Sequence, residues 1–376
     1  MQEKTGYRIA SFNIEKFSRQ SVHSASNKES RKDLDMIGRI IRENDIDIIA
    51  IQEITHQNAL KELLEKISLQ YAKEEIPTTS KEPDALTRFS NLTREVYGYS
   101  TKHWEGRWAK PSSIYSDKAA EGYAFIWNRD RIKLVTSYEN ETFEPRIGFN
   151  LKKGKLVRSP FIGRFMPIRG RFEFRIINTH IAWETPANVK DEADEQFKQD
   201  KTNLELRKSE LQTLLDTVYA SLDKKQYDVN RKDRHARPLV PYTFLLGDYN
   251  LNLPGVGEGA KMPESLERYR NGELEIITVN RSLTTLRDNP KDPEEAKKLR
   301  QDPNRAHHLA NNYDHFSYDR SKIIRHNIAD PEIGVVYAFE NYAGSETAEK
   351  SKYDLYREKV SDHLPIILDI DIRKRR

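Results

Sequence analysis

Six short clusters of acidic, amide and histidine side chains adjoin apolar stretches of this sequence, and residues of these types can bind metal ions or transfer protons. In an α/β sheet, the loops at strand ends converge on a ligand. A single carboxylate at a strand end has a simple explanation as a helix cap or turn residue. Six clusters together predict one shared reactive site, and they cover residues 11–15, 52–53, 178–180, 247–250, 313–315 and 361–363.

These residues suit the hydrolysis of a phosphate ester assisted by a hard divalent cation. Glu53, Asp362 and Asn13 offer oxygen atoms, the ligands that Mg²⁺ prefers. His180 and His363 can donate to phosphate oxygens or exchange protons. The pattern therefore predicts a metal-dependent phosphoric ester hydrolase.

A G-D-x-N segment places Asp248 and Asn250 where they could align and deprotonate a water molecule. The signatures H-E-x-x-H, G-x-x-x-x-G-K-[ST], G-x-S-x-G and G-x-G-x-x-G do not occur in the sequence. The pair His307-His308 is interpreted as part of a surface loop, because adjacent residues do not face one ligand on a regular element.

The composition narrows the class of protein. The chain has 376 residues, with 63 Lys+Arg against 59 Asp+Glu and a formal charge of +4, which permits a nucleic-acid partner without requiring one. The absence of cysteine excludes disulfide scaffolds, zinc–thiolate sites and a cysteine nucleophile. No apolar run approaches the ~18 residues of a transmembrane helix, and no signal peptide is visible. A cytoplasmic protein is expected, with export after processing left open.

The elements that must position the clusters alternate as in an α/β protein. Helical spacing of apolar residues predicts helices at 34–41, 59–67 and 204–222. Strands are predicted at 7–14, 46–51, 123–127, 155–165, 172–179, 242–246, 335–339 and 364–370. We expect a single domain over 1–376, with insertions near 73–94, 184–238 and 253–312.

The order of the motifs resembles that of the endonuclease/exonuclease/phosphatase superfamily, from Tyr7 to Ile370. S-D-H-x-P near the end of a chain that has S-F-N-I near its start and I-Q-E in between is a specific combination. The resemblance implies a four-layered α/β/β/α sandwich, with two packed mixed β-sheets and helices on both outer faces. Within the superfamily, E-x-Y-x-F at 121–125 and R-x-P at 158–160 resemble the deoxyribonuclease I-like branch most.

The resemblance also implies a metal site. Glu53 would be the main ligand, with Asn13 and Asp362 beside it, and the ion would be Mg²⁺, with Mn²⁺ or Ca²⁺ as alternatives. Glu15 stands two residues after Asn13, where exonuclease III-like enzymes have an acidic residue. It is interpreted either as an extra ligand or as a solvated residue at a strand end.

Catalytic roles follow from the same resemblance. His180 would pair with Glu121 and His363 with Asp314, so that each carboxylate orients its imidazole and favours the protonated form. Arg158 would contact a substrate phosphate. The residues that would orient the water and the scissile phosphate are Asp248 and Asn250.

The positions that would contact the substrate depart from those of deoxyribonuclease I. Thr55 and Ala119 stand where deoxyribonuclease I has an arginine and a tyrosine that contact DNA. The basic segment 144–175, with phenylalanines interleaved, could follow a phosphate backbone or be an ordinary half-buried hairpin. Trp104 and Trp108 are expected in the core.

We predict a monomeric endonuclease that acts on nucleic acid, on DNA rather than RNA, with no membrane partner. A phosphatase or phospholipase of the inositol phosphate or sphingomyelin type stays open as an alternative. A binding module without catalysis is the alternative from another class.

Overall fold

The structure of the chain is a computed structural model. It describes residues 6–17, 32–72, 89–90, 95–110, 121–135, 137–138, 141–142, 146–147, 156–170, 172–183, 203–224, 240–253, 276–279, 282–288, 290–325, 329, 331–341 and 350–371. The expected insertion 73–94 lies outside these residues except for 89–90, and the expected insertion 184–238 lies outside them except for 203–224.

The first sheet of the described residues has eight strands in the order β16-β17-β1-β2-β6-β5-β4-β3. Its strands are β1 (Gly6–Phe17), β2 (Ile48–Ile54), β3 (Phe89–Ser90), β4 (Glu95–Ser100), β5 (Trp104–Ala109), β6 (Tyr123–Asn128), β16 (Glu332–Val335) and β17 (Ile366–Asp371). β1 and β2 are parallel, whereas β1 and β17 are antiparallel, so the sheet is mixed.

The second sheet has the order β10-β11-β12-β13-β15-β14, and β7 also pairs with β11. Its strands are β7 (Ile132–Leu134), β10 (Arg146–Ile147), β11 (Phe161–Pro167), β12 (Phe172–His180), β13 (Val240–Asp248), β14 (Ile276–Val279) and β15 (Asp314–Asp319). β12 and β13 are parallel and the other described pairs are antiparallel. A separate small ribbon consists of β8 (Ser137–Tyr138) and β9 (Glu141–Thr142).

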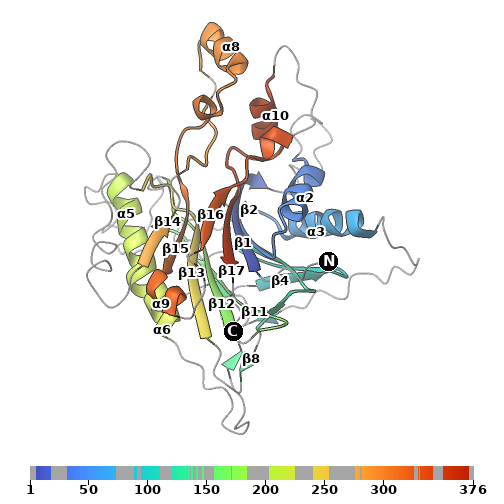
Figure 1. Ribbon diagram of the computed structural model, residues 1–376, viewed down its shortest axis with the longest axis vertical. Helices are drawn as coiled ribbons and strands as arrows, with labels where there is room; N and C mark the ends of the chain where they lie inside the picture. Colours follow the sequence, from blue (N-terminus) through green and yellow to red (C-terminus); the bar gives the residue numbers. More distant parts are fainter. Residues whose placement is uncertain are drawn as a thin grey trace.

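Helices cover the outer face of each sheet. Figure 1 shows α2 (Leu34–Glu43) and α3 (Gln57–Ala72) beside the first sheet, and α5 (Asn203–Thr213) and α6 (Ala220–Lys224) on the opposite side of the molecule. A π-helical stretch, η3 (Leu214–Tyr219), joins α5 to α6.

Three apolar clusters fill the spaces between these layers. Ile49 and Ile51 of β2 face the helices, whereas Ile48 and Ala50 face the second sheet. Because both faces of β2 are buried, its sequence is almost continuously apolar. The four-layered sandwich implied by the sequence is confirmed.

Shorter helices complete the described chain. They are α8 (Pro293–Gln301), η4 (Arg305–His308), α9 (Arg320–Arg325), η5 (Ala338–Asn341) and α10 (Lys352–Lys359). α10 begins with a capping box between Ser351 and Asp354. No helix among the described residues has the length and apolar character needed to cross a bilayer.

The predicted region 253–312 is not wholly an insertion. It contributes β14 to the second sheet, although residues 254–275 lie outside the described part. The two histidines in this region differ in environment. His307 is exposed and ion-paired with Asp302 at 2.6 Å, whereas His308 is buried and stacks on Tyr353. The surface-loop interpretation was therefore wrong for His308.

Two strand predictions need correction. Residues 156–160 precede β11 and are not in a strand, and residues 151–155 lie outside the described residues. The run 335–339 leaves the sheet at Val335 and continues into η5. There Phe339 is fully buried and packs on Tyr353 and Tyr356, so its apolar character reflects helix packing and not a strand.

Two arginines of the basic segment, both in the β11–β12 hairpin, are buried. Arg164 and Arg175 are 5% and 2% exposed. Glu173 lies between them, pairing with both, and Arg175 Nη1 donates to the carbonyl of Leu222 in α6 at 2.5 Å. These two arginines are therefore buried, whereas an ordinary half-buried hairpin would have placed them in solvent.

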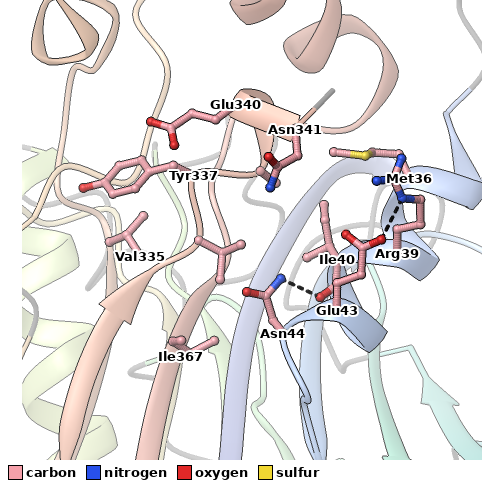
Figure 2. Close-up of a pocket in the computed structure, with 12 residues that line it drawn as sticks. Met36, Arg39, Ile40, Glu43, Asn44, Val335, Tyr337, Glu340, Asn341 and Ile367 are labelled. Carbon is pink, nitrogen blue, oxygen red and sulfur yellow. Dashed lines mark hydrogen bonds and ion pairs between the residues drawn. The ribbon is translucent and has the colours of Figure 1, made fainter. Parts of the chain in front are cut away.

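A pocket of 230 Å³ lies between α2 and the segment that contains β16 and η5 (Figure 2). Arg39, Glu43 and Tyr337 are among its lining residues. No member of the six polar clusters lines it, so the pocket is separate from the site described next.

Candidate active site

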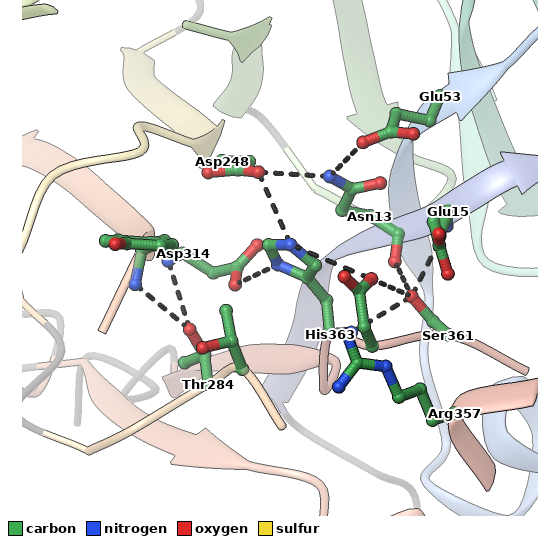
Figure 3. A network of polar contacts seen from close by, with 12 residues as sticks. Asn13, Glu15, Glu53, Asp248, Thr284, Asp314, Arg357, Ser361 and His363 are labelled. Atoms are coloured by element: carbon green, nitrogen blue, oxygen red, sulfur yellow. Dashed lines mark hydrogen bonds and ion pairs between the residues drawn. The ribbon is translucent and has the colours of Figure 1, made fainter. Parts of the chain in front are cut away.

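Asn13 joins the two sheets at the centre of the polar clusters. Its Nδ2 donates to Glu53 Oε1 at 2.9 Å and to Asp248 Oδ2 at 3.0 Å (Figure 3). Glu53 lies at the end of β2 in the first sheet, and Asp248 lies at the end of β13 in the second. The predicted metal ligands and the G-D-x-N segment therefore meet in one place.

The backbone at these strand ends adopts conformations that most residues avoid. Glu53 and Asn250 have φ angles of 60° and 50°. Residues other than glycine rarely occupy this region, and they concentrate at functional sites. Position 247 requires glycine. Its φ angle is 138°, and a Cβ there would lie 1.9 Å from the carbonyl oxygen of Thr179.

His363 is held by the carboxylate of Asp314. Its Nδ1 lies 2.9 Å from Asp314 Oδ2, and its Nε2 lies 3.6 Å from Asp248 Oδ2. Thr284 Oγ1 accepts from the backbone N–H of Asp314 and so helps to fix that strand end. Burial lowers the pKa of His363, but the charges of Asp314 and Asp248 outweigh burial and raise it well above its ordinary value.

His180 is held in a matching way by Glu121. Its Nδ1 lies 3.1 Å from Glu121 Oε2, and the same oxygen lies 2.8 Å from Arg158 Nη2. Burial and Arg158 lower the pKa of His180, but Glu121 and Asp248 outweigh them and raise it. Burial raises the pKa of Glu121, whereas His180 and Arg158 lower it to about 2 overall.

Both imidazoles converge on Asp248. The Nε2 atoms of His180 and His363 each lie 3.6 Å from Asp248 Oδ2. Burial raises the pKa of Asp248, and the two neighbouring imidazoles partly oppose that effect. Asn250 donates its backbone N–H to Asp248 Oδ1 at 2.8 Å, and its Nδ2 to the carbonyl of Ile181 at 2.8 Å. Asn250 therefore fixes the loop that follows β13 against the loop that follows β12.

The oxygen atoms near Glu53 fit a hard divalent ion. Asn13 Oδ1 is buried and has no hydrogen-bond partner among the described residues, as a carbonyl oxygen reserved for a cation would be. Glu53 Oε2 accepts from the backbone N–H of Lys16 at 3.1 Å. Asp362 Oδ1 lies 4.0 Å from His363 Nε2 and 3.5 Å from Ser361 Oγ, which donates to the Asn13 carbonyl at 2.7 Å.

Two other sets of acidic side chains near the site could contribute metal ligands. Glu53, Glu121 and His180 offer atoms within 4.8 Å of one another, but Arg158 and His180 already neutralise Glu121. Glu15 pairs with Lys16 at 3.2 Å, and its other oxygen lies 4.0 Å from Lys32. Glu15 is thus balanced by lysines, and Glu53, Asn13 and Asp362 are the oxygen-bearing residues that would hold an ion.

Helix α5 anchors the loops next to the site through two charged side chains, a role that the sequence did not predict. Glu210 is 2% exposed, and its carboxylate accepts from the backbone N–H groups of Val157 and Ala182. Arg207, one turn earlier, donates from Nη1 to the carbonyl of Asn250 at 2.6 Å. One face of α5 thus fixes the loops next to Arg158, His180 and Asp248. The signal was present, since Glu210 occupies a position between Leu206 and Leu214 on the apolar stripe.

Glu210 is expected to make stability depend on pH. Burial raises its pKa from 4.5 to about 7, so the folded chain holds a proton that the unfolded chain releases. Its contribution to stability is complete below about pH 4.5 and is lost as the pH rises through 7. Glu210→Gln does not titrate. Between pH 4.5 and 8, its unfolding free energy should therefore rise relative to wild type by about 3 kcal/mol.

Urea unfolding at several pH values measures this difference. Glu205→Gln, an exposed position on the same helix, is the matched control. If the wild-type and Glu210→Gln curves stay parallel across this pH range, Glu210 does not titrate as described.

Comparison with known proteins concerns the fold. No family model and no curated protein matches the chain. Among solved structures, an endonuclease/exonuclease/phosphatase from Bacteroides vulgatus is 11% identical, with a TM-score of 0.48 and coverage of 98% of this chain and 100% of that chain. A mannosyl-6-phosphatase from Bacteroides thetaiotaomicron is 13% identical, with a TM-score of 0.49 and coverage of 97% and 100%. An endonuclease/exonuclease/phosphatase family protein from Leptotrichia buccalis is 13% identical, with a TM-score of 0.44 and coverage of 97% and 100%.

Proposed function

We propose that the chain is a metal-dependent phosphoric ester hydrolase of the endonuclease/exonuclease/phosphatase superfamily. The observation that supports this proposal is the convergence of two carboxylate-held imidazoles on the buried Asp248, at 3.6 Å each. Two cationic donors and one acceptor that face a single point fit a phosphoryl group and the water that attacks it. A binding module would have no need of this arrangement.

Each side chain has a definite task in the proposed reaction. Asp248 orients the water and accepts its proton as the new P–O bond forms. His180 and His363 donate to the phosphate oxygens, and one imidazolium supplies the proton that the leaving oxygen takes as its bond to phosphorus breaks. Glu121 and Asp314 keep the imidazoles oriented and protonated.

Arg158 adds a positive charge beside Glu121 for the substrate phosphate. A divalent ion, when bound at Glu53, Asn13 and Asp362, would neutralise charge on the phosphate. Mg²⁺ is the ion that this oxygen donor set favours, because Mg²⁺ is usually held by one or two carboxylates and keeps several waters.

The substrate we propose is nucleic acid, cleaved internally at phosphodiester bonds by a monomeric enzyme. The motifs E-x-Y-x-F at 121–125 and R-x-P at 158–160 support this choice, since they resemble the deoxyribonuclease I-like branch. The β11–β12 hairpin gives no support, because its two central arginines are buried.

Digestion of supercoiled plasmid with Mg²⁺ tests the nuclease proposal. Wild type should nick the plasmid, and Asp248→Ala, purified in the same way, should not. Nicking by both samples would indicate a contaminating nuclease. Nicking by neither would reject plasmid DNA as a substrate.

A second candidate is the hydrolysis of a smaller ester by a phosphatase or phospholipase. The burial of Arg164 and Arg175 favours it, because a small substrate needs no extended cationic surface. A panel of phosphomonoesters and sphingomyelin, assayed with wild type and Asp248→Ala, distinguishes this activity from the nuclease.

A further inference from the structure

An aromatic and cationic cluster lies at the rim of the candidate active site and has no task in the reaction described above. The Arg207 guanidinium carbon lies 4.2 Å from the centroid of the Trp183 ring. The rings of Trp183 and Tyr313 are 5.6 Å apart and inclined at 57°. We call Trp183, Arg207 and Tyr313 the aromatic rim.

The aromatic rim is fixed next to the reacting groups. Trp183 comes three residues after His180, and Tyr313 directly precedes Asp314. Arg207 donates to the carbonyl of Asn250, and the Tyr313 carbonyl accepts from the Tyr249 N–H at 2.8 Å. A substrate with its phosphate at Asp248 would therefore have its neighbouring group within reach of these rings.

The exposure of Trp183 sets it apart from the other three tryptophans of the chain. Trp104, Trp108 and Trp127 are at most 7% exposed and belong to the core, whereas Trp183 is 47% exposed. Leu204, one turn before Arg207 on α5, is 43% exposed. Exposed single apolar residues are common, but an exposed indole beside catalytic groups offers a large flat surface for a ligand.

We propose that the aromatic rim is a stacking subsite for an unpaired nucleobase adjacent to the scissile phosphate. The proposal rests on the proposed function and names its substrate more closely. An indole face, a phenol ring and a guanidinium plane match the flat face of a base. A sugar would instead need several donors and acceptors for its hydroxyls, whereas among the three side chains of the rim the Tyr313 hydroxyl alone can accept.

Stacking also predicts which form of nucleic acid binds. A base inside a duplex is already stacked on its neighbours and must be unstacked before it can contact a protein ring. With the hairpin arginines buried, binding would depend on stacking and local charge more than on a long cationic track. We therefore expect single-stranded substrates to bind more tightly than duplexes.

The test measures binding and turnover separately. Labelled single-stranded hexathymidylate is titrated by fluorescence anisotropy in EDTA, beside an oligomer of the same length with abasic tetrahydrofuran units in place of the nucleosides. The proteins are wild type, Trp183→Ala, Trp183→Phe and Ile168→Ala. Ile168 is the matched control, because it is 49% exposed and lies just beyond the end of β11. The kcat and KM values for both oligomers are then measured with Mg²⁺.

Trp183→Ala is expected to weaken binding of hexathymidylate on the order of tenfold, and of the abasic oligomer less than twofold. Trp183→Phe should recover most of the loss, and Ile168→Ala should match wild type. In turnover, the loss should appear in KM and not in kcat. Equal weakening of both oligomers, or no weakening of either, overturns the stacking subsite. Failure of wild type to cleave hexathymidylate would instead count against the nuclease proposal, while the anisotropy data still decide on stacking.

Discussion

Replacing His363 by asparagine is expected to lower kcat for a phosphate ester by about 10²- to 10⁴-fold, the usual contribution of a positioned acid–base group. Asparagine is chosen because its Nδ2 can take the place of the imidazole Nδ1 that faces Asp314, 2.9 Å away in wild type. Alanine would leave the buried Asp314 carboxylate without that partner and could unfold the chain. The asparagine variant removes only the Nε2 donor that faces Asp248.

Steady-state kinetics and thermal melting, measured on the same preparations, check this result. His307→Asn is the control, since His307 is exposed and pairs with Asp302 outside the site. A His363→Asn enzyme with near wild-type kcat and an unchanged Tm would show that His363 takes no part in the chemistry.

Removal of divalent ions is expected to lower the rate of phosphate ester hydrolysis at least a hundredfold. Addition of Mg²⁺ or Mn²⁺ should restore that rate. The reason is the oxygen donor set at Glu53, Asn13 and Asp362, in which Asn13 Oδ1 is buried without a partner in the described part of the chain. Glu53→Gln should weaken Mn²⁺ binding on the order of a hundredfold, because even partners of direct ligands contribute about 10- to 100-fold.

Isothermal titration with Mn²⁺ measures the affinity independently of turnover. Glu43→Gln, at an exposed side chain of α2 that pairs with Arg39, is the matched control. Full activity in EDTA, or equal Mn²⁺ affinity for Glu53→Gln and wild type, would refute the proposed ion site.

The sequence was sufficient to predict the fold and the meeting of the six clusters. Apolar runs that end in Glu53 and in Asp248 indicated strands buried on both faces, and the parallel pairs β1–β2 and β12–β13 bring their ends to one region. The hydrogen bonds from Asn13 to both carboxylates show why residues distant in sequence act together.

Side-chain environments inside the outer layers could not be predicted in the same way. Alternation along β11 and β12 indicated that Arg164 and Arg175 point away from the phenylalanine face, but not that Arg175 contacts α6. A glutamate in a helix is usually exposed to solvent. Glu210 is buried because two loops present backbone N–H groups to its carboxylate. Such placements depend on contacts between distant segments and not on local periodicity.

Residues near both ends of the sequence meet at the reacting centre. Ser361 Oγ donates to the carbonyl of Asn13, 348 positions away, and β1 lies between β17 and β2. A chain that stops before residue 361 lacks Ser361, His363 and strand β17, so the reacting centre cannot form until these residues have been synthesised. A truncated product of this kind should have none of the proposed hydrolase activity.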